Sequence, residues 1–72
     1  MTAVLTRHAR LEMVRRGIAE HLVMEILAKP EQVVPEREGL VAYQSRMATG
    51  DKGVMLVRVI VEDRLTPRRV IT

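Results

Sequence analysis

Residues 6–17 read T-R-H-A-R-L-E-M-V-R-R-G, and the rest of the chain is organised around this stretch. Thr6 is a favourable N-cap residue, and Gly17 is the residue type that most often ends a helix. A helix between them has an apolar row of side chains, Leu5, Ala9 and Met13. A charged row lies beside it, formed by His8, Glu12 and Arg16. The stretch therefore predicts a short amphipathic helix that needs packing against the rest of the chain.

A second helical pattern follows from Glu20 to Ala28. Its apolar residues recur at helical spacing and form one stripe: Leu22, Val23, Ile26 and Leu27. Lys29 suits the negative end of the helix dipole, and Pro30 cannot continue the helix. The two segments predict a helical hairpin with a very short turn.

From Glu31 onward, β-branched residues and turn signals replace the helical periodicity, which is typical of strands. We expect strands and the turns between them in this order: strands at 32–34, 40–47, 54–62 and 68–72, and turns at 36–39, 48–53 and 63–67. The strand at 54–62 has apolar residues on both faces, which favours a central position. Residues 1–5 are expected to form a lead-in to the first helix. The fold class is α+β: one domain, residues 1–72, in which the helical hairpin covers one face of a three- to four-stranded antiparallel sheet.

Composition limits the kinds of chemistry available. The chain of 72 residues has no cysteine, one aromatic residue, Tyr43, and a net charge of +3, and ten of its twelve cations are arginine. Without cysteine there is neither a disulfide nor a thiolate metal site, so we expect a cytoplasmic protein with no metal and no cofactor. The longest apolar run is too short to span a bilayer, so we expect no membrane association. The small excess of arginine fits a phosphate-rich partner or the coding bias of a GC-rich gene.

Two residues are candidates for catalysis. His8 has a side chain suited to acid or base catalysis near neutral pH, and it could equally be structural. Arg58 interrupts the apolar strand on the face directed away from the helices, where its guanidinium either grips a phosphate or pairs with Glu62 or a neighbouring strand.

Two further residues are candidates for binding a substrate. Arg16 follows Glu12 by four residues, so an ion pair alone would explain their spacing. Tyr43 either packs against the helices or stacks on a base.

Several segments in order resemble one small bacterial family, the domain of unknown function 4258: T-R-H-A-R-L-E-M-V-R-R-G-I, L-A-K-P, V-V-P, V-A-Y-Q, M-L-V-R-V-I-V and V-I-T. This family looks similar to the RelE and ParE toxin fold. The resemblance implies a helical hairpin on a curved antiparallel sheet and an endoribonuclease that works without metal and is neutralised by an antitoxin peptide. By this resemblance His8, Arg16, Tyr43 and Arg58 match the family pattern, whereas Glu12 stands where an arginine is common.

Two functions follow as hypotheses. In the first, a toxin-like domain binds RNA, His8 activates the 2′-hydroxyl, and Arg58 and Arg16 stabilise the phosphorane. In the second, the domain is a noncatalytic interaction module or an inactive toxin relative. Its open sheet face, with Leu56 and Ile60, then holds a partner or a second copy in a homodimer.

Overall fold

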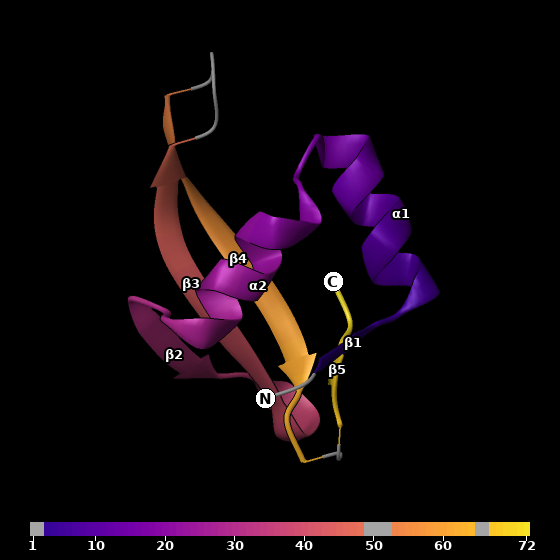
Figure 1. Cartoon of the computed structure of the whole chain (residues 1–72). Coiled ribbons are helices and arrows are strands. Elements are labelled where there is room, and N and C mark those ends of the chain that lie inside the picture. The colour runs from indigo at the N-terminus through magenta and orange to yellow at the C-terminus, as the bar shows by residue number, and fades with distance from the viewer. Residues whose placement is uncertain (1–2, 49–52, 65–66) are drawn as a thin grey trace.

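The computed structural model describes residues 3–48, 53–64 and 67–72. Two helices lie on the same face of a five-stranded sheet (Figure 1). The elements in chain order are β1 Ala3–Leu5, α1 Arg7–Arg16, α2 Glu20–Ala28, β2 Gln32–Pro35, the short 3₁₀ helix η1 Arg37–Gly39, β3 Leu40–Ala48, β4 Val54–Glu62 and β5 Arg68–Val70. The predicted α+β class and both helices are confirmed.

The sheet has the order β1-β5-β4-β3-β2, so β4 is the middle strand, as predicted. The expectation of a three- to four-stranded, wholly antiparallel sheet is wrong, because β1 pairs parallel with β5, and Leu5 lies opposite Val70. The segment predicted as a lead-in therefore contains a strand. Three residues are too short to show a strand period, and their pairing depends on a segment more than sixty residues away.

β4 has the predicted bounds, and the other three predicted strands differ from the observed ones by one or two residues. β2 extends through Pro35 and β3 through Ala48, whereas β5 ends at Val70 and not at Thr72. Pro35 is tolerated because β2 is an edge strand. The predicted turns at 48–53 and 63–67 fall partly on residues 49–52 and 65–66, which lie outside the described residues.

Both ends of α1 have the predicted caps. Thr6 Oγ1 accepts a hydrogen bond from the Ala9 N–H at 3.2 Å and donates one to the Val70 carbonyl oxygen at 2.8 Å. Gly17 adopts a left-handed conformation with φ 67°, and the Ile18 N–H then donates to the Met13 carbonyl oxygen at 2.8 Å. The Thr6 hydroxyl thus joins the start of α1 to β5, and Gly17 directs the chain toward α2.

The core lies between the helices and the sheet. Val57, Val59 and Val61 of β4 point to the helices and are buried, whereas Leu56 and Arg58 point to the opposite, open face. The buried core residues come from both helices and three strands: Leu5, Ala9, Val23, Ile26, Leu27, Val57, Val59, Val61 and Val70. This alternation fixes the register of β4 and hence which residues reach the open face.

Candidate functional site

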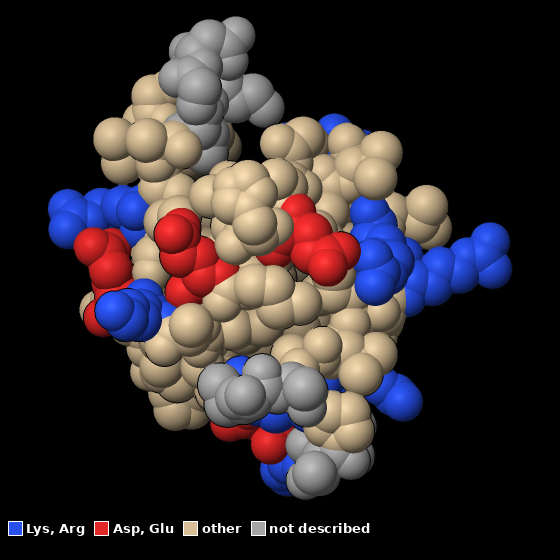
Figure 2. All heavy atoms as spheres, viewed as in Figure 1, with Lys and Arg blue, Asp and Glu red and all other residues tan. Residues whose placement is uncertain are grey.

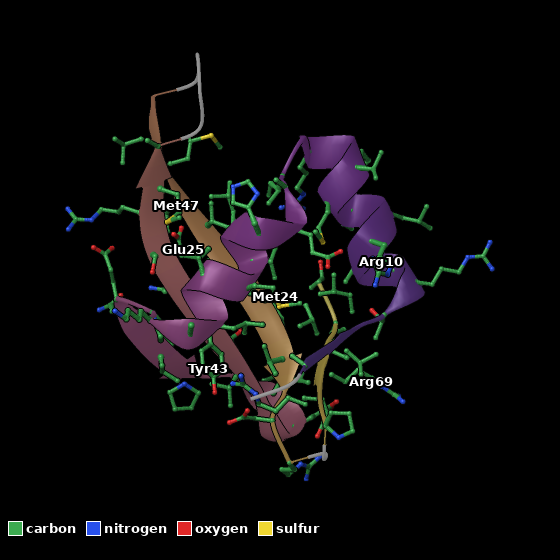
Figure 3. All side chains as sticks on the ribbon, in the orientation of Figure 1. Arg10, Met24, Glu25, Tyr43, Met47 and Arg69 are labelled. Carbon is green, nitrogen blue, oxygen red and sulfur yellow. The ribbon has the colours of Figure 1, made fainter. Side chains whose placement is uncertain are left out.

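The four residues predicted as site residues lie in different parts of the molecule. His8 and Arg16 are exposed on α1, and Arg58 is exposed on the open face of β4. Tyr43 lies on β3 on the helix side, at the end of the sheet remote from α1 (Figure 3). The structure therefore brings Arg16 and Arg58 near one another but does not bring Tyr43 to them.

Glu12 binds Arg16, as its four-residue spacing allows, and also Arg15. Its Oε1 lies 3.3 Å from Arg16 Nη2 and 3.1 Å from Arg15 Nη2. The Arg15 hydrogen bonds are the largest influence on the carboxyl group, and together with the positive charges of Arg15, Arg16 and His8 they lower the pKa of Glu12. At neutral pH Arg16 is therefore paired with a carboxylate.

Arg58 is held by two partners on the open face. Its Nε donates to Gln44 Oε1 at 3.0 Å, and its Nη2 donates to Glu36 Oε2 at 3.1 Å. Gln44 is on the neighbouring strand β3, directly opposite Arg58, whereas Glu36 immediately precedes η1. Glu62, the other partner considered from the sequence, binds Arg64 at 2.9 Å.

Tyr43 belongs to a separate polar cluster. Its hydroxyl donates to Asp63 Oδ2 at 3.1 Å, and the Arg68 guanidinium lies 5.3 Å from the ring centroid. The Arg68 side chain is only 13% exposed, and its Nη1 is 3.7 Å from Asp63 Oδ1. A cation over an aromatic face is stabilising, so this cluster joins the ends of β3, β4 and β5.

Arg16 and Arg58 line two cavities beside β4. The first is a small cavity of about 50 Å³ beneath α1, which Glu12 and Met13 also line. The second, which we call the edge groove, has a volume of about 360 Å³ and is bounded by the turn between the helices and by β4: Arg16, Gly17, Ile18, Leu22, Met55, Leu56, Val57 and Arg58. Neither cavity is lined by His8 or Tyr43.

β5 pairs with only the last part of β4 within residues 3–48, 53–64 and 67–72. The Ile60 N–H donates to the Thr72 carbonyl oxygen at 2.8 Å, and the Ile60 carbonyl accepts from the Ile71 N–H at 2.7 Å. In an antiparallel ladder both backbone groups of a residue point to one side, and the side alternates along the strand. The backbone groups of Arg58, Leu56 and Val54 therefore point to the same side as those of Ile60. No described strand pairs with them there.

The side chains along this half of β4 are apolar and exposed. Val54 is 70% exposed, Met55 43% and Leu56 55%. We call residues 54–58 the exposed segment of β4. From the sequence we predicted Leu56 on an open surface, but not the exposure of Met55 on the helix side.

Charge on the helix side is mixed. Figure 2 shows acidic side chains across the middle of this view with basic side chains at its margins. Arg10 binds Glu20 at 3.0 Å, and Arg46 binds Glu31 at 3.3 Å. The Arg46 hydrogen bonds lower the pKa of Glu31. Among the described residues, no group of three or more His, Asp or Glu is placed to hold a metal ion, and no helix has the length and apolar character to cross a membrane.

The chain is a small α+β domain whose middle strand carries exposed apolar side chains. The chain belongs to the family described as Domain of unknown function (DUF4258), whose model matches residues 5–72. Comparison with curated proteins and with solved structures gave no match.

Proposed function

We propose that this chain is a small noncatalytic protein-interaction module that binds its partner through the exposed segment of β4. The observation that carries the proposal is the run of exposed apolar side chains in this segment, where Val54 is 70%, Met55 43% and Leu56 55% exposed. Met55 and Leu56 also line the edge groove. Apolar side chains that are exposed next to one another mark interaction sites in many soluble proteins.

The arrangement of the cations also supports binding over catalysis. Arg16 and Arg58, the two cations nearest the edge groove, are paired with Glu12 and Glu36. A ribonuclease needs cations available to the phosphate and a base close to them, and His8 lines neither cavity beside Arg58. The edge groove is instead lined mostly by apolar side chains, including Ile18 and Leu22.

Capture of a binding partner by the wild type and by two matched variants tests the proposal. A tagged chain is used as bait in host cells that also produce an untagged copy. Leu56→Lys places a charge on the exposed segment of β4, and Leu11→Lys places the same charge on α1, where Leu11 is 60% exposed. We expect a bound protein with the wild type and with Leu11→Lys, and its loss with Leu56→Lys. Equal capture by all three chains, or no capture, contradicts the proposal.

A toxin-like domain that binds RNA, with metal-independent endoribonuclease activity and an antitoxin peptide as its partner, is the second candidate. One observation favours it: Arg16 and Arg58 both line the edge groove, and none of the residues lining it is acidic. An RNA cleavage assay with the wild type and His8→Ala tests it. Cleavage that is lost in His8→Ala, with RNA binding that weakens as salt rises, supports this candidate. Equal activity of both chains, or none, excludes catalysis by His8.

A further inference from the structure

We infer that Met55 is an oxidation site, and that its conversion to the sulfoxide switches off binding at the exposed segment of β4. The inference rests on the proposed function and adds the regulation of the same surface. Two observations support it: Met55 is the most exposed methionine among the described residues, and it lines the edge groove. One added oxygen atom therefore changes the polarity of the binding surface itself.

The chain offers a peroxide few other targets. It has no cysteine and no tryptophan, so all of its sulfur is in five methionines. Hydrogen peroxide transfers one oxygen atom to a methionine thioether: the O–O bond breaks, an S–O bond forms, and the sulfur loses two electrons. The peroxide is reduced to water. The product is a polar, chiral sulfoxide in place of a flexible apolar side chain.

Exposure distinguishes Met55 from the other methionines. It is 43% exposed, whereas Met13, Met24 and Met47 are partly buried and pack against the core. Met1 lies outside the described residues. Met47 provides a matched comparison, because it lies directly opposite Met55 on β3 and on the same face of the sheet. The two side chains differ in burial, so a peroxide in solution reaches Met55 first.

The position of Met55 explains why a sulfoxide there opposes binding. Met55 lies between the exposed Val54 and Leu56, and it lines the edge groove with Ile18 and Leu22. In the reduced form its flexible apolar side chain suits a contact that a partner covers. A sulfoxide oxygen accepts hydrogen bonds from water on the free chain, and burying it without a donor is unfavourable. The partner therefore binds the reduced chain more tightly.

Oxidation of Met55 should leave the fold intact. The buried core is formed by other residues, and the next residue of β4 on the helix side, Val57, is 6% exposed. The Met55 side chain lies beyond this core, so an oxygen atom on its sulfur stays in contact with water in the free chain. Loss of binding can therefore be measured separately from loss of stability.

Peptide mass spectrometry after brief treatment of the purified chain with hydrogen peroxide tests the site. Trypsin cleaves after Lys52, so Met47 and Met55 fall in different peptides. We expect the Met55 peptide to gain one oxygen atom several times faster than the peptides of Met13, Met24 and Met47. In denaturant all four should oxidise at similar rates, because the difference comes from burial. Oxidation of Met47 as fast as Met55 in the folded chain overturns the inference.

Capture by the oxidised chain tests the switch. The tagged wild type is treated with hydrogen peroxide, freed of it, and mixed with the protein that the untreated chain captures. We expect capture to be lost and a methionine sulfoxide reductase to restore it. Each variant is compared with its own untreated sample: Met24→Leu should lose capture on oxidation, whereas peroxide should not change capture by Met55→Leu. Undiminished capture by the oxidised wild type, or no recovery with the reductase, overturns the inference.

The outcomes separate the switch from the proposed function. If the untreated chain captures a protein and oxidation does not change this, the switch falls and the interaction module stands. If the untreated chain captures nothing, both fall. Circular dichroism of the oxidised chain monitors the fold, and a loss of capture that accompanies unfolding also overturns the switch.

Discussion

The Ile60 N–H donates to the Thr72 carbonyl oxygen at 2.8 Å, and from Ile60 toward Val54 no described strand lies on that side of β4. Among the described residues, β4 therefore has strands on both sides near Ile60 and a strand on one side, β3, near Val54. Its buried valines hold the core together in the central half, while Leu56 and Val54 face solvent in the other.

Amide hydrogen exchange should reveal these two halves. We expect the Leu56 and Arg58 amides to exchange faster than those of Val57 and Val59, whose backbone groups point to β3. Exchange monitored residue by residue by NMR measures the contrast. Equal protection of all four amides would show that the β5 side of β4 is covered at residues 56–58.

Removing the Thr6 hydroxyl should destabilise the fold. Thr6→Ala loses the helix cap and the hydrogen bond to Val70 together, so we expect a loss of about 1–2 kcal/mol in the free energy of unfolding. Chemical denaturation measures it. Thr6→Ser keeps the hydroxyl and should stay close to the wild type, and an equal loss in both variants would contradict the role given to the hydroxyl.

Gly17→Ala should cost about 1–2 kcal/mol, because a side chain makes the left-handed conformation at φ 67° unfavourable. A Cβ at this position meets nothing within 4 Å, so the cost comes from the backbone alone. Asn adopts this conformation more readily than Ala, so Gly17→Asn should lose less in the same denaturation experiment. A larger loss for Asn than for Ala would point to crowding.

Truncating Ile26 tests the core between α2 and the sheet. Ile26 is 1% exposed, so Ile26→Val should cost about 0.5–1.5 kcal/mol and Ile26→Ala about 2–5 kcal/mol in unfolding free energy. The exposed control Leu11→Ala should change it by less than about 0.5 kcal/mol. Similar costs for the control and Ile26→Ala would mean that α2 is not docked as described.

Glu12 should make stability depend on pH. Its pKa is lowered in the folded chain, so its contribution is present above the ordinary carboxyl pKa and is lost as pH falls through the lowered value. Glu12→Gln should therefore lower Tm slightly at pH 7, and the difference from the wild type should shrink as the solution becomes acidic. Glu25→Gln is the control, since Glu25 is exposed on α2 and forms no ion pair with a described residue. A Tm difference that is independent of pH would exclude the ion pairs as its cause.

Local patterns were sufficient for most of the fold. Thr6 and Gly17 bound a helix, and the apolar stripe of α2 and the alternation in β4 identify the buried residues, because these depend on near neighbours in the chain. The spacing of Glu12 and Arg16 indicated their ion pair. The strand at Ala3–Leu5 was missed because its pairing with β5 is a long-range contact.

For the candidate site, the residue types in the sequence indicated four side chains suited to catalysis or substrate binding: Arg16, Arg58, His8 and Tyr43. Family resemblance suggested that they act together. Only the tertiary structure decided where they meet: Arg16 and Arg58 share a groove, while Tyr43 binds Asp63 at the other end of the sheet. It also decided that Met55 and Leu56 are exposed beside this groove. Local sequence sets which side of a strand a residue faces, but the packing of distant segments sets which neighbours that side receives.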